Sequence, residues 1–337
     1  MIRSLFITVL LFTLTSLISS LTCLDRHNQP TAWFTILKYP RKLTKYQPRH
    51  AFLSENTSNR MLIISNPPDV YDEAVPNTIR SINNVVNILA FNDDIPGIEV
   101  RFSKGHAKGI LAYDEKKGSG VYIIHSLPNF PEIMNNQLVY EFPSNTHTYG
   151  QHVYCVTFQK ETLEEILESL MVVEPHGYFS KGIFKDFDTR RRKESLPSRI
   201  INWNLTNGDM HYMFTKSSKH AKYLYEDMIS GYFGSSLHVS SWGRPYQLPS
   251  CGLSFKTLNV KKIMLHNGDS WTGGSDHSKW AVSERGVGRP VTCFCDLNRM
   301  TSQKSRGGGC LCSSNRSLHE AFSSMIVETD SCNYDDL

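Results

Sequence analysis

Two short stretches decide how this chain folds: Gly105-His106-Ala107-Lys108-Gly109 and Asp276-His277-Ser278-Lys279-Trp280. Each places a histidine two residues before a lysine, next to a run suited to a β-strand, residues 110–113 in the first case and 281–283 in the second. Because alternate side chains of a strand share a face, each histidine and its lysine should point into the same space. A lysine beside an imidazole suits an anionic substrate, so the two pairs predict a site that is built twice.

A third His-x-Lys, His220-Ala221-Lys222, shows that the spacing alone does not identify a functional site. It enters a helical pattern, and side chains two apart on a helix point about 200° away from each other, so these two do not share a face. We therefore set it aside. The signal lies in the spacing together with the strand, and in its repetition.

The segments that follow the two pairs echo each other. A predicted hairpin over residues 110–124 brings His125 and Asn129 to one end of the sheet. A strand at residues 291–294 leads in a similar way to Asn298. This echo suggests two related halves of the chain, each with its own histidine, lysine and asparagine.

Two further segments help to place these elements. Pro175-His176-Gly177 breaks the pattern of helices and strands and is the predicted junction between the halves. Residues 78–89 carry apolar side chains at helical spacing and are predicted to form a helix.

The beginning of the chain predicts entry into the secretory pathway. Residues 1–20 combine an early arginine, a short apolar run and a small-residue end, which is typical of a cleavable signal peptide, whereas a spanning helix needs roughly 20 apolar residues. No later stretch approaches that length, so the mature protein should be lumenal or extracellular, with no membrane span. Three sequons agree with this route and are candidate glycosylation sites: Asn56, Asn204 and Asn315.

The overall charge is mildly basic, with 36 lysines and arginines against 32 acidic residues and a net charge of +4 at pH 7. The 13 histidines change this in an acidic compartment, because imidazoles near their ordinary pKa of about 6.5 gain charge there. The protein would then attract polyanions. The basic segments at residues 41–49 and 190–193 suit such a partner, although solvated loops are the simpler explanation.

With these features in view, the chain resembles the deoxyribonuclease II (acid DNase) family, which is similar in turn to the phospholipase D superfamily. The stretches that carry the resemblance span nearly the whole mature chain in the family's order: Leu21-Thr22-Cys23, the two His-x-Lys stretches, His125-Ser126-Leu127-Pro128-Asn129-Phe130-Pro131, Thr148-Tyr149-Gly150-Gln151, Asp296-Leu297-Asn298-Arg299 and Arg306-Gly307-Gly308-Gly309.

The resemblance implies an α/β fold with mixed sheets flanked by helices, a pseudo-dimer of two phospholipase D-like halves that share one central active-site cleft. The signal peptide would cover residues 1–20, the first half residues 21–174 and the second half residues 175–337. The implied activity is endonucleolytic hydrolysis of DNA at acidic pH, without a metal or other cofactor and without base specificity, leaving 3′-phosphate ends. The implied location is lysosomal or extracellular. Whether the protein forms a homodimer is left open.

The residue types suggest how this reaction would run. One neutral histidine attacks phosphorus to form a phosphohistidine, and the other, protonated, donates to the leaving 5′-oxygen. Superfamily analogy favours His106 as the nucleophile and His277 as the acid, although the sequence itself does not separate the two roles. The remaining groups expected to stabilise the transition state or to assist are Lys108, Lys279, His125, Asn129 and Asn298.

The acidic residues depart from the superfamily pattern. The superfamily places an aspartate five residues after the lysine, where this chain has Tyr113, followed by Asp114, in the first half and Glu284 in the second. A catalytic role for Asp114 or Glu284 is therefore not expected. Metal-assisted hydrolysis would want clustered carboxylates, and only Asp93-Asp94 offers a pair.

All eight cysteines lie beyond the signal peptide, and an even number in a secreted chain predicts disulfides. Cys293-x-Cys295 and Cys310-x-Cys312 also match a four-cysteine zinc site, but the secretory context favours two nested bridges. The pairs that the family resemblance implies are Cys23–Cys155, Cys251–Cys332 and Cys293–Cys312, which leaves Cys295–Cys310 as the fourth.

Two other functions stay open at this point. The same fold and site would also suit another phosphodiester, RNA or a phospholipid. A secreted family member with little turnover would only bind DNA, with an affinity that depends strongly on salt.

Overall fold

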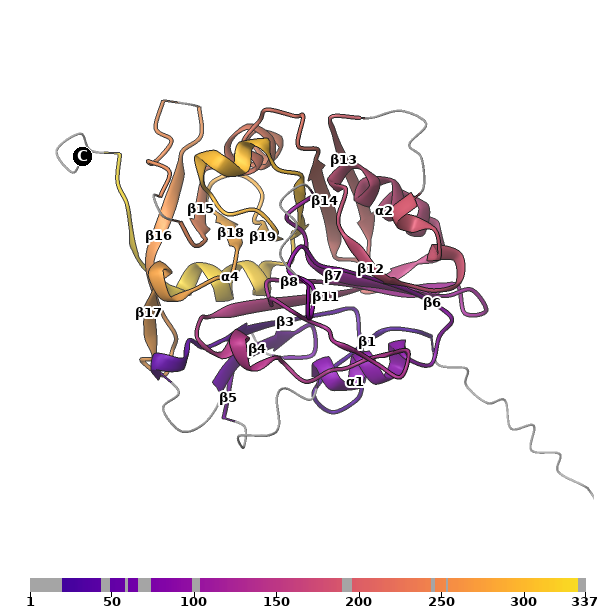
Figure 1. The fold of residues 1–337 in the computed structure, drawn as a ribbon. Coiled ribbons are helices and arrows are strands. Elements are labelled where there is room, and N and C mark those ends of the chain that lie inside the picture. The colour runs from indigo at the N-terminus through magenta and orange to yellow at the C-terminus, as the bar shows by residue number, and fades with distance from the viewer. Residues whose placement is uncertain are drawn as a thin grey trace, which may run out of the picture.

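The computed structural model describes residues 20–43, 49–57, 60–65, 74–98, 104–189, 196–243, 246–252 and 254–332 (Figure 1). The predicted signal peptide, apart from Ser20, and the basic segment 190–193 lie outside these described residues, as do residues 44–48 of the other basic segment. Within the described ranges, no helix combines the length and the apolar character that crossing a membrane requires.

Eight strands form the first sheet, in the order β12-β6-β7-β8-β11-β3-β4-β5, with antiparallel neighbours throughout. Their bounds are β3 (Trp33–Lys38), β4 (Arg49–Ser54), β5 (Leu62–Ser65), β6 (Asn87–Phe91), β7 (Gly109–Asp114), β8 (Ser119–His125), β11 (Gln151–Gln159) and β12 (Gly177–Ser180). The central strands are rich in β-branched and aromatic residues and buried on both faces, as expected for a covered sheet. The hairpin predicted over residues 110–124 is confirmed as β7 and β8.

Nine strands form the second sheet, in the order β13-β14-β20-β19-β18-β15-β16-β17, with β21 paired to β16. Their bounds are β13 (Ser198–Asn204), β14 (Met210–Lys216), β15 (Leu237–Ser240), β16 (Thr257–Met264), β17 (Ser270–Thr272), β18 (Trp280–Ser283), β19 (Thr292–Cys295), β20 (Gly308–Ser313) and β21 (Ile326–Thr329). Strands β15 and β16 run parallel, and the other neighbours run antiparallel. Two short hairpins complete the strands: β1 (Cys23–Leu24) with β2 (Pro30–Thr31), and β9 (Ile133–Met134) with β10 (Gln137–Leu138).

The two sheets share one hydrophobic core, so the protein is a mixed α/β molecule built around the contact between them. Tyr154 of the first sheet stacks on Phe294 of the second, with ring centroids 4.2 Å apart. Helices α2 (Lys160–Val173) and α4 (Arg316–Met325) add their apolar faces to the same core, and Phe322 of α4 packs edge-on against Phe294 at 5.2 Å. The sheets are therefore held face to face by aromatic packing.

Other helices cover the outer faces of the two sheets. Helix α1 (Ala74–Ile82) packs on the first sheet, and the π-helical segment η5 (Leu224–Ser230) packs on the second. The predicted helix over residues 78–89 is wrong beyond Ile82, because the chain turns there and enters β6, whose five residues are all buried. Pairing with β7 in a covered sheet outweighs the helical spacing of the apolar residues.

Both His-x-Lys stretches lead into the middle of a sheet. The first leads into β7 and the second into β18. In each sheet the next neighbours follow in chain order, β8 and β11 in the first and β19 and β20 in the second, and a helix, α2 or α4, comes next. The two histidines thus occupy similar positions relative to the strands around them.

All eight cysteines are paired in the structure: Cys23–Cys155, Cys251–Cys332, Cys293–Cys312 and Cys295–Cys310. The last two bridges join the neighbouring strands β19 and β20 in register, Cys293 opposite Cys312 and Cys295 opposite Cys310. The strands that carry the zinc-like spacing are therefore cross-linked to each other.

A buried arginine connects three parts of the second half. Arg299 is 1% exposed, and its Nε donates to Glu226 Oε1 of η5 at 2.7 Å. Its two terminal nitrogens donate to Asn259 Oδ1 of β16 at 2.9 Å and to the carbonyl oxygens of Gln247 and Leu248. This one side chain therefore satisfies polar groups from a helix, a strand and a loop.

We expect Arg299→Leu to lower the free energy of unfolding by about 3–5 kcal/mol, because it leaves the Glu226 carboxylate buried without its partner. The measurement is the midpoint of thermal and urea unfolding, with the exposed Arg316→Leu as the matched control. Equal midpoints for the two variants would contradict the structural role of Arg299.

Candidate active site

The two His-x-Lys stretches lie just before their strands rather than within them. Strand β7 begins at Gly109 and β18 at Trp280, the residue after each lysine. The expectation that each pair sits on a strand is therefore corrected by a few residues. The reason is that the N–H groups of His106 and His277 bond to residues beside the opposite sheet, although the lysine carbonyl oxygens already pair with the neighbouring strands β8 and β19.

These backbone bonds are reciprocal. The N–H of His106 donates to the Gly307 carbonyl oxygen at 2.8 Å, next to β20, and the N–H of His277 donates to the Gly150 carbonyl oxygen at 2.9 Å, next to β11. Gly150 is required at its position because a Cβ there would lie 2.6 Å from Asp276 Oδ1. Each histidine is thus fixed by the sheet that does not carry it.

The lysines continue this reciprocal pattern. The N–H of Lys108 donates to Asp296 Oδ1 at 3.4 Å, and the N–H of Lys279 donates to His152 Nδ1 at 3.1 Å. Burial, and then the positive charge of Lys108, lower the pKa of Lys279 to about 8. The Lys108 N–H donates to Asp296, and the Lys279 carbonyl oxygen accepts from the adjacent residue Cys295, so the two His–Lys pairs lie close together.

Asp93 is the negative partner of this site. Its carboxylate accepts a hydrogen bond from Lys108 Nζ and one from Arg306 at 3.2 Å, and it lies 3.9 Å from His106 Nε2. Burial works against ionisation, but the positive charges of Lys108 and Arg306 hold the pKa of Asp93 well below its ordinary value. Lys108 Nζ also donates to Asn92 Oδ1 at 2.7 Å.

Asp93 and Asp94 do not act as a pair. Asp94 turns away from the lysines and accepts from Asn129 Nδ2 at 2.9 Å. Within the part of the chain that the structure describes, no group of three or more histidine, cysteine or acidic side chains is placed to hold a metal ion.

The His106 ring is held in one orientation by the second half of the chain. Its Nδ1 lies 2.8 Å from Gln303 Oε1, an acceptor, so Nδ1 carries the proton and Nε2 carries the lone pair. Burial, and then the nearby cations Lys279, Lys108 and Arg306, lower the pKa of His106 to about 3 against the opposing effect of Asp93. The imidazole is therefore neutral in the free protein.

The His277 ring is held differently, between aromatic side chains. Tyr149 stacks on it with centroids 4.0 Å apart and planes 8° apart, and Trp242 packs against it at 5.4 Å and 62°. Burial and the charges of Lys279 and Lys108 lower the pKa of His277 to about 3. Its Nε2 is buried without a hydrogen-bond partner among the described residues.

His125 lies in the same region, at the end of β8. It is 1% exposed, its N–H donates to the Lys108 carbonyl oxygen at 3.2 Å, and its ring packs edge-on against Phe130. Burial and the charge of Lys108 lower its pKa to about 3. In the second half, the N–H of Cys295 donates to the Lys279 carbonyl oxygen at 2.8 Å. The position that corresponds to His125 is therefore occupied there by a disulfide-bonded cysteine.

The two asparagines differ. Asn129 has a positive φ of 53°, its Nδ2 donates into the 94–95 turn, and its Oδ1 accepts from Asn145, so its side chain is bound within its own loop. Asn298 is half-buried, its Oδ1 has no partner among the described residues, and it lines a small cavity together with Gln303. Asn298 is therefore the better placed of the two to accept a new hydrogen bond.

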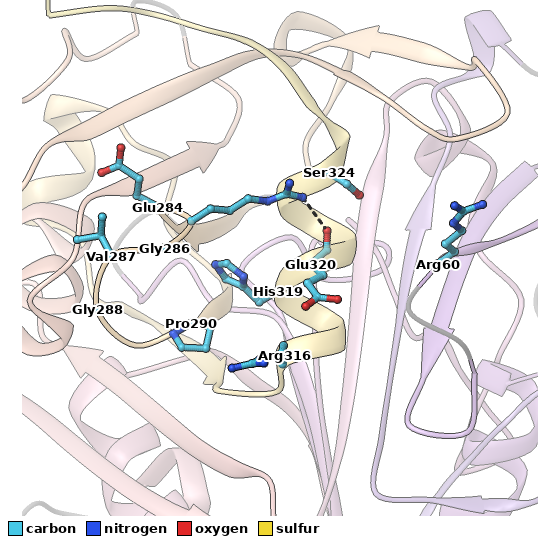
Figure 2. Close-up of a pocket in the computed structure, with 11 residues that line it drawn as sticks. Arg60, Glu284, Gly286, Val287, Gly288, Pro290, Arg316, His319, Glu320 and Ser324 are labelled. Atoms are coloured by element: carbon cyan, nitrogen blue, oxygen red, sulfur yellow. Dashed lines mark hydrogen bonds between the residues drawn. The ribbon is translucent and has the colours of Figure 1, made fainter.

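Asp114 and Glu284 lie at the far ends of β7 and β18, away from the histidines. Asp114 accepts from the backbone of Lys116 in the β7–β8 turn. Glu284 lines a separate cavity of about 690 Å³ formed with α4, where Arg285 donates to the Glu320 carbonyl oxygen (Figure 2). Neither acid belongs to the site.

The residues that sequence reasoning missed come from outside the two motifs. Arg306 and Tyr149 stand in stretches already quoted for the resemblance, but without a role, and Asp93 lies two residues after β6, the strand that pairs with β7. Strand adjacency was the available signal for Asp93. Gln303 and Trp242 carry no comparable signal, because their positions depend on the folding of the second half.

The pKa shifts of the histidines make the stability of the free protein depend on pH. Between about pH 3 and pH 6.5 the unfolded chain binds a proton on His106 and on His277 that the folded chain does not, so acidification destabilises the fold. Asp296 acts in the opposite direction, because burial raises its pKa to about 7.

We expect the wild-type protein to lose more thermal stability between pH 7 and pH 4.5 than a His106→Gln, His277→Gln double variant. The measurement is the melting temperature at both pH values, and the exposed His27→Gln variant serves as control. The same loss in all three proteins would contradict the neutral state of the two histidines.

Comparison with known proteins agrees with this arrangement. The deoxyribonuclease II family pattern matches residues 22–332. The chain is 31% identical to plancitoxin-1 of Acanthaster planci, over 97% of this chain and 96% of the relative. It is 27% identical to deoxyribonuclease-2-beta of Mus musculus, over 97% of each, and 28% identical to deoxyribonuclease-2-alpha of Sus scrofa, over 94% of this chain and 92% of the relative. The chain therefore belongs to the deoxyribonuclease II family and is a hydrolytic endodeoxyribonuclease.

Proposed function

We propose that this protein cleaves DNA at acidic pH without a metal or other cofactor, through a phosphohistidine, and leaves 3′-phosphate ends. The observation that carries the proposal is the convergence of two His–Lys pairs in one site, each fixed by the opposite sheet. One phosphodiester needs a nucleophile, a proton donor and cations for its oxygens. The two pairs supply all three.

We also propose that the chain is a pseudo-dimer of two phospholipase D-like halves, residues 21–174 and 175–337, around a shared cleft. The strand order supports this: β6-β7-β8-β11-β3 in the first sheet corresponds to β15-β18-β19-β20-β14 in the second, and the chain passes through both sets with β3 and β14 first, then β6 and β15. Strand β12 comes after the proposed junction and returns to the edge of the first sheet, beside β6.

The reaction proceeds in two steps. His106 Nε2 attacks phosphorus, the bond from phosphorus to the 5′-oxygen breaks, and His277 gives its proton to that oxygen. Water then attacks the phosphohistidine, His277 accepts the proton from the water, and the bond from nitrogen to phosphorus breaks. The products are a 3′-phosphate and a 5′-hydroxyl. Both histidines return to their starting states.

The tautomer of His106 supports its assignment as the nucleophile. Gln303 holds the proton on Nδ1 and leaves the Nε2 lone pair free to attack. Lys108 and Lys279 bind the non-bridging oxygens, and His125 and Asn298 assist in holding the phosphate. Asn129 has a supporting role, because its side chain fixes the loop after β8.

The acidic optimum follows from the charges of the site. Burial, and then the charges of Lys279 and Lys108, lower the pKa of His277 to about 3 in the free protein. A bound phosphate between these lysines offsets their charge and raises the pKa of His277 toward its ordinary value. Catalysis then needs a pH low enough to protonate His277, while His106 stays neutral.

The first 20 residues and the cysteines indicate how the protein is processed and where it acts. We propose that residues 1–20 are removed, that the protein acts in the lysosome or outside the cell, and that Asn56, Asn204 and Asn315 carry glycans. Asn56 and Asn204 are exposed. Asn315 is half-buried at the start of α4, where its side chain accepts from Leu318 N.

We expect nicking of supercoiled plasmid at about pH 5 with excess chelator present, and loss of nicking in a His106→Ala, His277→Ala double variant. RNA and phospholipid vesicles in the same buffer test the alternative substrates. Salt-sensitive DNA binding without any nicked product would instead favour a binding protein. Equal nicking by the double variant would rule out the histidine mechanism.

A substrate whose leaving group needs no proton distinguishes the nucleophile from the proton donor. We expect His277→Ala to lose at least about 100-fold in rate on DNA but to keep most of the initial burst of p-nitrophenolate from a nucleoside 3′-(p-nitrophenyl phosphate), because p-nitrophenolate leaves as an anion and the burst precedes hydrolysis of the phosphohistidine. His106→Ala should lose both activities. The reverse pattern would exchange the nucleophile and the acid.

A further inference from the structure

We propose that Tyr149 and Trp242 form an aromatic slot that positions His277 as the proton donor and stabilises its protonated form, an inference that rests on the proposed function. Both are positioning residues, since each acts through the imidazole. The slot is built across the two halves, because Tyr149 precedes β11 of the first sheet, whereas Trp242 and His277 belong to the second half.

The contrast between the two histidines motivates the proposal. His106 has a hydrogen-bond acceptor on Nδ1 and a carboxylate 3.9 Å from Nε2, so its tautomer is set by polar groups. For the His277 ring, the ring contacts that the structure records are the stacked Tyr149 and the T-shaped contact with Trp242. His277 must gain and lose a proton in the proposed reaction, and these contacts hold its ring without fixing one protonation state.

The charged groups around His277 explain why the aromatic rings matter. The amines that lower its pKa are Lys279, in its own stretch, and Lys108, from the first half. The nearest carboxylate in sequence, Asp276, is already occupied, with Trp271 Nε1 at 2.8 Å and Ser278 N at 2.7 Å. Because no anionic group among the described residues pairs with the His277 imidazole, the aromatic rings are the favourable contact for its protonated form.

The stacking geometry suits this task. A cation within about 6 Å of an aromatic centroid is attracted by the negative face of the ring, and Tyr149 and Trp242 lie at 4.0 and 5.4 Å. Tyr149 keeps its place although it is 37% exposed, because the next residue, Gly150, bridges Asp276 and accepts from His277 N. The same bond therefore fixes the histidine and the ring that covers it.

The test compares Tyr149→Leu, which removes the ring, with Tyr149→Phe, which keeps it. The readout is the pH dependence of kcat for plasmid or oligonucleotide cleavage. We expect Tyr149→Leu to shift the alkaline limb of the kcat–pH profile to lower pH by about 0.5 to 1.5 units. The loss of kcat is then about 3- to 30-fold on that limb and smaller at lower pH. Tyr149→Phe should keep the wild-type limb, and Trp242→Leu should shift it in the same direction as Tyr149→Leu.

A second measurement keeps this test separate from the proposed function. The pKa of His277 is followed by NMR in labelled wild-type, Tyr149→Phe and Tyr149→Leu proteins, and it should be lowest in Tyr149→Leu whether or not DNA is cleaved. A uniform loss of kcat at every pH, with an unchanged His277 titration, would overturn the aromatic slot. A normal slot in a protein that cleaves no DNA would overturn the proposed function instead.

Discussion

The active site depends on a pair of reciprocal backbone bonds between the two sheets. His106 is fixed by the Gly307 carbonyl and His277 by the Gly150 carbonyl, each from the opposite sheet. Neither half can position its own histidine alone, so the site exists only when the sheets are packed face to face. The aromatic contact between Tyr154 and Phe294 in the shared core is therefore a condition for catalysis as well as for stability.

The charge balance of the site follows from this packing. Three cations, Lys108, Lys279 and Arg306, surround one strongly ionised carboxylate, Asp93. Asp296 adds no negative charge at acidic pH, because burial raises its pKa to about 7. The positive charge that remains is preorganised for a phosphodiester, and it adds to the effect of burial, which keeps the pKa values of His106 and His277 low until an anion arrives.

The sequence predicted the parts of the site that local patterns encode. The two His-x-Lys spacings, the hairpin after the first and the strands around them follow from periodicity and turn residues. Three of the cysteine pairs rested on family resemblance and the fourth on nesting. The helix over residues 78–89 failed beyond Ile82, because Val85 and Val86 lie in the connection to β6 and Leu89 lies in that buried strand, so the helical spacing spans different elements.

The remaining parts of the site depend on contacts between distant segments. Gln303 reaches His106 across almost two hundred residues of chain, and Tyr149 reaches His277 across more than a hundred. No local pattern specifies which side chain closes on which ring, since that depends on how the sheets pack. Asp93 is intermediate, because its position at the end of a strand beside β7 can be inferred once the strand order is known.

The two halves are not equivalent, and the difference explains how one site performs two roles. The first half adds a buried imidazole, His125, beside its lysine, whereas the second half places the Cys295–Cys310 bridge at the matching position. His106 lies against Asp93 and Gln303, and His277 lies between two aromatic rings. A symmetric site would give both histidines the same hydrogen-bond partners and the same tautomer. In the proposed mechanism, the unequal surroundings allow one to remain a neutral nucleophile while the other carries the proton.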